Sequence, residues 1–203
     1  MENEENDDNL FLYICNPMRT GSTYLYNFFR VCIRYETRKY ENVPFNVNPI
    51  SDRVIVPIRH PVAALSSMID YFNKDHDEAT IRELYERVKK EFAWAYSHIE
   101  RWPQVCHRID YERFINNPGY IANWVRTTIG VEVFNIEKFA EEFTISNVKR
   151  LVKGKINKHV NLFQENHISN YDGDNEIRIE KIRNTGIMYT ELQKLSNKYG
   201  YEF

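Results

Sequence analysis

The sequence predicts an α/β fold in which a central parallel sheet carries helices on both faces. Short apolar runs alternate with longer amphipathic stretches along most of the chain. One of these runs, Val54–Ile58, consists mainly of apolar β-branched residues, which is typical of a buried parallel strand. No internal repeat or second-domain boundary interrupts the pattern, so we expect one α/β domain over residues 10–203.

Hydrophobic periodicity and helix-start residues place the individual elements. Apolar runs predict strands at Leu10–Cys15, Arg53–Ile58 and Val105–Ile109. Apolar residues at three- and four-residue spacing predict helices at Ser22–Ile33, Pro61–Phe72, Ala79–Arg101, Gly119–Ile129, Ile136–Phe143, Ser146–Val152 and Ile177–Tyr199, the last interrupted near Gly186. Pro61 suits the first position of its helix, where a missing N–H costs nothing. Connections are expected at Arg34–Ser51 and Lys153–Asp174.

The composition fits one substantial core and an anionic ligand. Hydrophobic residues make up 42% of the 203 residues, enough for a single core of good size. Five acids fall within the first eight residues, so residues 1–9 are expected to form a disordered acidic tail. Without those five charges the net charge would change from −2 to +3, which is too small to indicate a nucleic-acid partner.

Targeting signals and cysteine usage favour a cytoplasmic protein. No apolar run approaches the length of a transmembrane helix and the N-terminus lacks signal-peptide features, so no membrane association is expected. Cys15, Cys32 and Cys106 stand alone in apolar contexts, which predicts buried thiols in a reducing compartment. No cysteine or histidine spacing matches a metal site, so no metal is expected.

The loop between the first strand and the first helix has the composition of an anion-binding site. Gly21 allows the backbone to turn and expose its N–H groups, and Thr20, Ser22 and Thr23 add hydroxyl donors. The helix that follows points the positive end of its dipole at the same place. A phosphate or sulfate group is therefore expected here, with an ordinary Gly-Ser turn as the alternative.

This loop is P-loop-like, but it departs from the pattern G-x-x-x-x-G-K-[ST]. When Gly21 is aligned with the second glycine, Asn16 replaces the first glycine and Ser22 replaces the lysine. Without that lysine the loop is poorly equipped to hold β- and γ-phosphates beside Mg²⁺, and the nearby cation is Arg19 instead. The pattern favours a phosphate donor other than ATP or GTP.

A second motif follows the second predicted strand. Arg59 lies at the carboxyl end of that strand, where ligands of open α/β sheets gather. Ser67 lies eight residues later, about two helical turns along. Together they could hold a further phosphate. The alternative is that Arg59 pairs with a carboxylate and Ser67 is a small packing residue.

These two motifs resemble those of the sulfotransferase superfamily. PMRTGSTYL resembles its 5′-phosphosulfate-binding loop, and RHPVAALSS resembles its 3′-phosphate-binding motif. CHRIDYERFINNP and ENHISNYDGD are similar to two further segments of the family, so that the resemblance spans residues 10–174. It implies sulfuryl transfer from 3′-phosphoadenosine 5′-phosphosulfate (PAPS), without a metal, in a short, divergent and soluble member of the family.

The resemblance also implies roles for individual residues. Arg19 would neutralise charge on the bridging oxygen as the sulfuryl group leaves, and Arg59 and Ser67 would hold the 3′-phosphate. Tyr111 would lie near the adenine, and His167 and Ser169 near the 3′-phosphate. The 5′-phosphate would be held by a run of loop residues, Thr20, Gly21, Ser22, Thr23 and Tyr24. A departure from the family is Ala63, where many relatives carry aspartate.

The general base is assigned to Glu36. Attack by an acceptor hydroxyl needs a proton acceptor within hydrogen-bond reach. Many relatives use a histidine between the two motifs, but none lies between Arg19 and Arg59 here. Glu36 follows the first helix and could line the cleft, while the alternative is a surface ion pair with Arg34, Arg38 or Lys39. Further candidates are Glu41, Asp52 and His60.

The sequence thus predicts a PAPS-dependent sulfotransferase that acts on a hydroxyl, or less readily an amine, of a small-molecule acceptor. One alternative is a divergent P-loop kinase that uses ATP, in which Asp110 would bind magnesium. Another is a nucleotide-binding module that kept the cofactor site and lost the base. The sequence gives no indication of oligomeric state.

Overall fold

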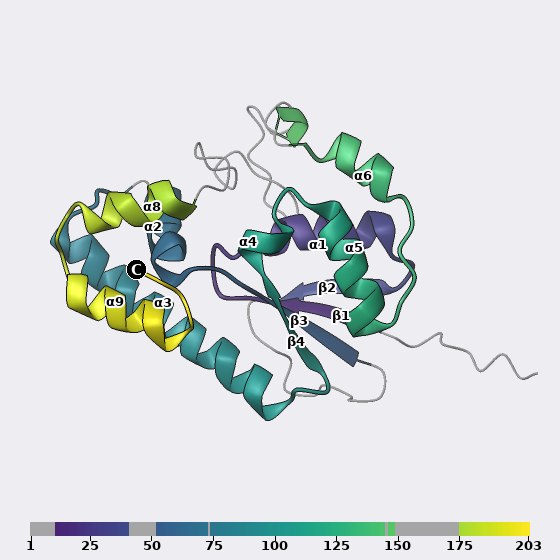
Figure 1. Cartoon of the computed structure of the whole chain (residues 1–203), viewed down its shortest axis with the longest axis horizontal. Coiled ribbons are helices and arrows are strands. Elements are labelled where there is room, and N and C mark those ends of the chain that lie inside the picture. The colour runs from purple at the N-terminus through teal and green to yellow at the C-terminus, as the bar shows by residue number, and fades with distance from the viewer. Residues whose placement is uncertain (1–10, 41–51, 73, 145, 149–174) are drawn as a thin grey trace, which may run out of the picture.

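The computed structural model describes residues 11–40, 52–72, 74–144, 146–148 and 175–203. Four strands form one parallel sheet in the order β2-β1-β3-β4. Their bounds are β1 Phe11–Cys15, β2 Glu36–Tyr40, β3 Asp52–Ile58 and β4 Cys106–Asp110. All four carboxyl ends point the same way, towards the helices α2, α8 and α9 in Figure 1. The predicted parallel sheet is confirmed.

The helices largely occupy the predicted stretches. Their bounds are α1 Ser22–Cys32, α2 Pro61–Tyr71, α3 Glu78–Arg101, α4 Tyr111–Phe114, α5 Pro118–Trp124, α6 Ile136–Glu142, α8 Asn175–Arg183 and α9 Tyr189–Lys198. Asp77 caps α3 by accepting a 2.7 Å hydrogen bond from the N–H of Thr80. A π-helical turn, Val125–Ile129, extends α5, which explains why a single helix was predicted there.

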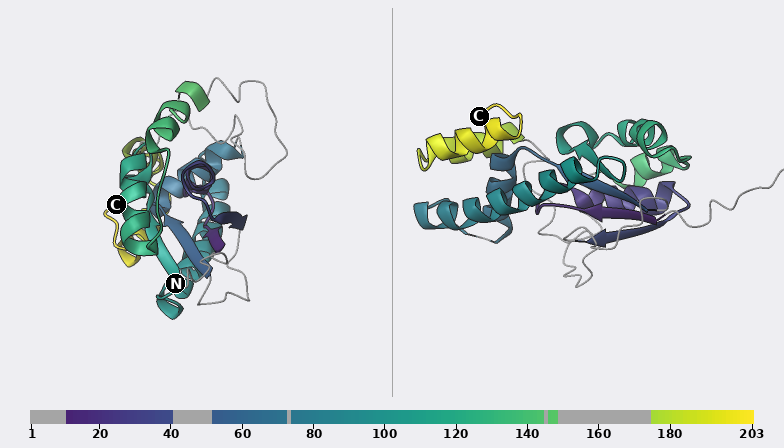
Figure 2. Two further views of the ribbon diagram at one scale, coloured as in Figure 1. Left: turned by 90° about the vertical axis from the view of Figure 1, so that its right-hand side faces the viewer. Right: turned by 90° about the horizontal axis from the view of Figure 1, so that it is seen from below.

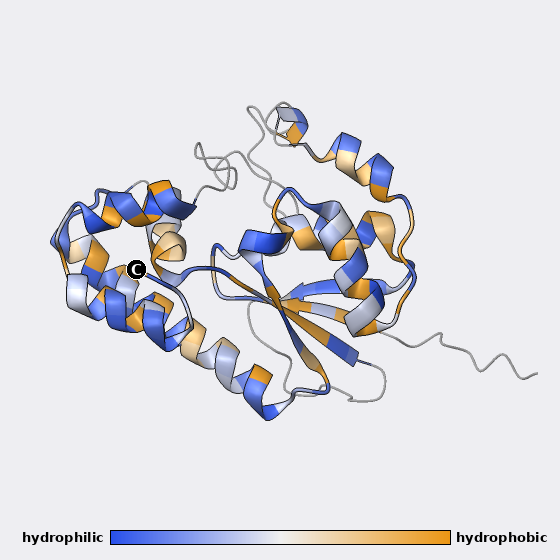
Figure 3. Ribbon diagram, in the orientation of Figure 1, coloured by the Kyte–Doolittle hydropathy of each residue, from blue (hydrophilic) through white to orange (hydrophobic). Residues whose placement is uncertain are grey.

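Helices cover both faces of the sheet, as predicted (Figure 2). Side chains alternate between the faces along β3, so Val54 and Val56 enter one core while Ile55 enters the other. The first core includes residues of α2, α3 and α9, and the second includes residues of α1, α5 and α6. Figure 3 shows the hydrophobic colour on the inner strands β1 and β3 and in stripes on several helices, whereas the edge strand β2 is hydrophilic.

Strand β2 was not predicted, and it corrects the interpretation of Arg34–Ser51 as a connection. Its sequence, ETRKY, is polar because it forms the edge of the sheet, beyond β1. Polar and charged side chains protect exposed sheet edges, and they also hide the apolar signal of a strand. The acidic tail and the predicted loop Lys153–Asp174 lie outside the described residues. None of the described helices combines the length and apolar character needed to cross a membrane.

Candidate anion-binding site

The loop from β1 to α1 leaves the start of α1 without a side-chain cap. Gly21 occupies the N-cap position with φ 81° and ψ 13°, and no side chain there accepts a hydrogen bond from the first turn. The carbonyl of Gly21 accepts the N–H groups of Tyr24 and Leu25 at 3.0 and 3.3 Å. The N–H groups of Ser22 and Thr23 precede these, at the positions where a helix offers donors to an anion.

Two properties of the position require glycine at residue 21. The left-handed backbone costs any residue with a Cβ about 1–2 kcal/mol. A Cβ would also lie 2.8 Å from Cζ of Phe114 and 2.8 Å from Cδ2 of Tyr111. Phe114 is fully buried, so its ring has no room to move aside. The loop therefore packs directly on α4.

Arg19 connects this loop to α2. Its Nε donates a 3.0 Å hydrogen bond to Oγ of Ser67, and its guanidinium lies 4.8 Å from the centre of the Tyr71 ring. Burial, followed by repulsion from Arg59 and Arg178, lowers the pKa of Arg19 to about 10. Arg19 therefore remains charged at neutral pH. An anion bound nearby would offset the repulsion among these cations.

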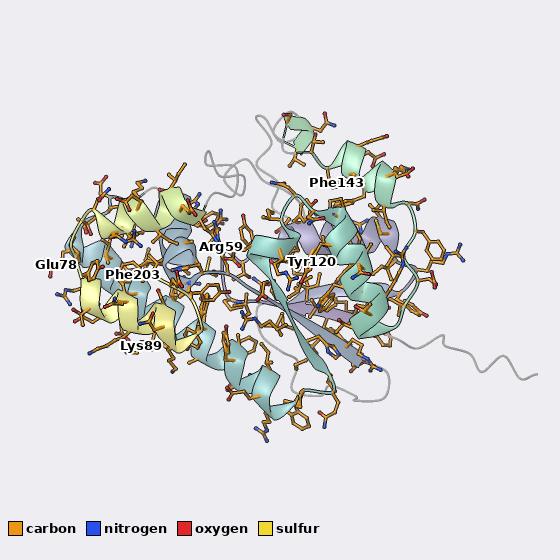
Figure 4. All side chains as sticks on the ribbon, viewed as in Figure 1. Arg59, Glu78, Lys89, Tyr120, Phe143 and Phe203 are labelled. Atoms are coloured by element: carbon orange, nitrogen blue, oxygen red, sulfur yellow. The ribbon has the colours of Figure 1, made fainter. Side chains whose placement is uncertain are left out.

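Arg59 is the most informative residue of the site. It is only 3% exposed, and Figure 4 shows it between the sheet and the helices α2, α8 and α9. Its Nε donates to Oδ1 of Asn175 at 2.6 Å, and its Nη1 donates to the carbonyl of Arg19 at 3.3 Å. Its guanidinium lies 4.2 Å from the centre of the Tyr111 ring.

No carboxylate within the described part of the chain forms an ion pair with Arg59, although the negative charge of Glu112 acts on it. Nη2 of Arg59 is buried without a hydrogen-bond partner among those residues. Burial lowers its pKa. Because a buried cation with an unsatisfied donor is costly, the observation points to a ligand that supplies the missing acceptor and negative charge. The predicted alternative, a structural ion pair of Arg59, finds no support among these residues.

Sequence reasoning missed three polar residues at the site. Asn175 begins α8, and its Nδ2 donates to Oε1 of Glu112 on α4 at 2.6 Å. Lys39 on β2 donates from Nζ to Oγ1 of Thr23 at 2.8 Å. The register of β2 explains Lys39, because Lys39 pairs with Ile14 one residue before the carboxyl end of β1. Recognition of β2 as a strand would have revealed Lys39. Glu112 lies in the segment CHRIDYERFINNP but was given no role there, and no sequence signal marks Asn175.

The other predicted loop residues have mixed outcomes. Thr20 is fully buried and its hydroxyl donates to the carbonyl of Pro17 at 2.8 Å, which fixes the loop from within. The side chain of Tyr24 does not lie at the loop, because its ring packs in the core against Phe114 and Phe139. Tyr111 lies against the Arg59 guanidinium, and its position near an adenine stays a prediction.

Glu36 does not lie at the site, which corrects its assignment as the base. It pairs with Phe11, at the amino-terminal start of β1, so it lies at the opposite end of the sheet from the loop. Its carboxylate accepts hydrogen bonds from the guanidinium of Arg38 at 2.6 Å on the surface. The predicted alternative, a surface ion pair, is therefore what the structure has. Asp52 begins β3 at the same far end.

His60 lies close to Arg59, but both of its ring nitrogens are engaged. Its Nε2 lies 2.6 Å from the carbonyl of Glu202, which requires a proton on Nε2, and its Nδ1 accepts the N–H of Val62 at 3.2 Å. Neither nitrogen has a lone pair left to accept a proton from an acceptor substrate. The predicted residues Glu41, His167 and Ser169 lie outside the described residues.

Three observations bear on magnesium. Oδ1 of Asp110, the candidate magnesium ligand of a kinase, accepts a 2.6 Å hydrogen bond from Arg108. Among the residues that the structure describes, no group of three or more histidines, cysteines or acids is arranged to hold a metal ion. The ammonium of Lys39 contacts Thr23, the residue aligned with the magnesium-binding hydroxyl of a nucleotide triphosphate loop.

Comparison with known proteins assigns no family. The chain matches no protein-family model, and a search of curated proteins finds no significant relative.

Proposed function

We propose that this protein is a PAPS-dependent sulfotransferase that transfers a sulfuryl group to the hydroxyl of a small-molecule acceptor. The observation that carries the proposal is the buried Arg59, whose Nη2 lacks an acceptor among the described residues, close to the uncapped start of α1. Two anion-binding places at the ends of neighbouring strands suit a ligand with phosphates at two separate positions. PAPS has this distribution of charge, with a 3′-phosphate and a 5′-phosphosulfate.

The 5′-phosphosulfate is assigned to the loop. Backbone N–H groups at Ser22 and Thr23, together with the ammonium of Lys39, supply positive charge there. The 3′-phosphate is assigned to Arg59, with Arg19 and Ser67 beside it. This assignment moves Arg19 nearer to the 3′-phosphate than sequence resemblance implies, and it gives Lys39 the position beside the transferred group.

The reaction requires stabilisation of a leaving phosphate. The acceptor oxygen forms a bond to sulfur while the bond from sulfur to the bridging oxygen breaks, and that electron pair passes to the 5′-phosphate of the product, 3′-phosphoadenosine 5′-phosphate (PAP). The hydroxyl proton passes to a base. Preorganised donors near the developing charge make the largest contribution to such reactions, and Lys39 and the start of α1 are placed to provide them.

The contacts of Lys39 and Asp110 favour sulfuryl transfer over the kinase alternative. A kinase of this type needs Mg²⁺ between the phosphates and the loop hydroxyl. Here an ammonium contacts Thr23, and Asp110 is paired with Arg108. These contacts suit a loop that binds its anion with the cationic groups of the protein and without Mg²⁺.

A nucleotide-binding module without catalysis is the second candidate. It is favoured by the position of Glu36 at the far end of the sheet and by the two occupied nitrogens of His60. The test is incubation of the protein with PAPS and a panel of phenols, alcohols and amines, with PAP release measured by chromatography. Acceptor-dependent release of PAP supports the sulfotransferase. If the protein binds PAP tightly but releases no PAP from PAPS with any acceptor class, the result supports the non-catalytic nucleotide-binding module.

A further inference from the structure

The Arg59 guanidinium is held by its surroundings from several directions. Nε faces Asn175, Nη1 faces the carbonyl of Arg19, and the ring of Tyr111 lies 4.2 Å from its centre. Only Nη2 lacks a hydrogen-bond partner among the described residues. The direction of this remaining donor is thus set by the groups that engage the other two nitrogens.

Asn175 can contact both Arg59 and Glu112 in only one orientation of its side-chain amide. Its Nδ2 donates to Oε1 of Glu112 at 2.6 Å, while its Oδ1 accepts from Nε of Arg59 at 2.6 Å. A carboxylate only accepts hydrogen bonds and a guanidinium only donates them. A flipped amide would place oxygen against oxygen and N–H against N–H. Glu112 therefore holds the amide so that Oδ1 of Asn175 faces Arg59.

Glu112 is itself anchored to α2. The same Oε1 accepts the backbone N–H of His60 at 2.8 Å, and His60 is the N-cap residue of α2. One carboxylate oxygen on α4 thus joins the start of α2 to the start of α8, with Arg59 next to both. Asn175 is hydrogen-bonded to both Glu112 and Arg59, so the carboxylate of Glu112 acts on the cation through Asn175 and through its charge, without an ion pair between the two.

We propose that Glu112 and Asn175 are positioning residues, which orient Arg59 so that its Nη2 is presented to a phosphate of the bound nucleotide. This inference rests on the proposed function, because it takes the ligand of Arg59 to be the 3′-phosphate. It predicts that the two residues contribute to recognition of that one phosphate and contribute little to binding of the rest of the nucleotide.

The test compares the affinities of PAP and adenosine 5′-phosphate, which lacks the 3′-phosphate, in calorimetric titrations. Asn175→Ala and Glu112→Ala should each weaken PAP binding about tenfold, the scale of one hydrogen bond to a charged group, with adenosine 5′-phosphate affected less than about twofold. Glu112→Gln keeps an oxygen for both donors and should stay within about threefold of the wild type. Glu180→Ala, an exposed change on the same helix as Asn175, is the control.

The outcomes separate the two proposals. A wild type with no preference for PAP over adenosine 5′-phosphate would overturn the proposed function. A wild type with that preference, retained in full by Asn175→Ala and Glu112→Ala, would overturn the positioning role alone. Equal weakening of both nucleotides by these variants would also overturn it, since a general structural role produces that result. If Glu112→Ala fails to fold, Asn175→Ala still tests the role, because it removes the contacts to both Arg59 and Glu112.

Discussion

Nε of Arg19 donates a 3.0 Å hydrogen bond to Oγ of Ser67, across 48 residues of sequence. The contact joins the loop after β1 to the helix after β3, so two motifs that are separate in sequence form one site. In this position Arg19 has a left-handed backbone, at φ 64°, which is uncommon for a residue other than glycine. Such strain persists where surrounding contacts over-determine the conformation, as Ser67 and Tyr71 do here.

Arg59→Met should weaken PAP binding without lowering the thermal stability of the protein. Loss of the charged donors should weaken PAP binding by roughly 2 kcal/mol or more, about thirtyfold. The same change removes a buried cation that repels Arg19, so the thermal midpoint should stay the same or rise. Calorimetric titration and thermal unfolding of the variant measure the two effects. Arg82→Ala, an exposed arginine paired with Glu78, is the control and should change neither quantity.

Gly21→Ala should be far more damaging than the same substitution at Gly130. Both glycines have left-handed backbones, with φ 81° and 79°, so both variants incur about 1 kcal/mol of backbone strain. Only at Gly21 does the new Cβ meet Phe114 and Tyr111, which adds roughly 1–3 kcal/mol of overpacking. Urea unfolding of both variants measures the difference. Equal losses of unfolding free energy would contradict the close packing of the loop on α4.

Lys39→Ala should weaken recognition of the 5′-phosphate. The ammonium contacts Thr23 beside the start of α1, so its loss should lower the affinity for adenosine 5′-phosphate about tenfold. Adding Mg²⁺ should not restore the lost affinity, because the described residues offer no cluster of acids or histidines to hold a metal there. Lys89→Ala on the exposed face of α3, where Lys89 pairs with Glu86, is the matched control. An unchanged affinity in Lys39→Ala would remove Lys39 from the site.

One buried and two partly buried histidines should make the protein less stable in mild acid. Burial lowers the pKa of His60, His76 and His107 below the ordinary value of 6.5. The unfolded chain therefore takes up protons first as the pH falls below about 6.5, and the free energy of unfolding decreases in that window. At higher pH all three are neutral in both states and the full stability is present.

The measurement is urea unfolding at pH 7.5, 6.5 and 5.5. His60→Asn should reduce the dependence on pH, because it removes one titrating group while asparagine can still cap α2. The same slope in the variant and the wild type would show that His60 is not protonated differently in the two states. A wild type that becomes more stable towards pH 5.5 would contradict the sign of all three shifts.

The sequence predicts the order of buried elements well, because those signals are local. The run Val54–Ile58 identifies β3, and the four-residue spacing of apolar residues identifies α3. Hydrophobic periodicity does not predict the edge strand β2, because ETRKY has no buried apolar face. With β2 missed, Glu36 was assigned to the site, although strand register carries it to the opposite end of the sheet.

The site itself was predicted in part. Arg19 could be named as the cation of the loop after the first strand, Arg59 because it directly follows the second, and Ser67 because it lies eight residues after Arg59. Asn175 and Glu112 could not, because they meet Arg59 and each other only through tertiary packing, across 116 and 63 residues of sequence. Asn175 has no local pattern that distinguishes it from an ordinary surface residue, and the segment CHRIDYERFINNP that contains Glu112 does not predict the contact between the two.

The most direct test of the sulfotransferase account is calorimetric titration of the protein with PAP in EDTA and in Mg²⁺, with ATP and Mg²⁺ as the comparison. The account predicts that PAP binds equally well under both conditions and at least about a hundredfold more tightly than ATP, because Arg59 recognises a 3′-phosphate that ATP lacks. Magnesium-dependent binding of ATP, with no binding of PAP, would contradict the account and favour a kinase.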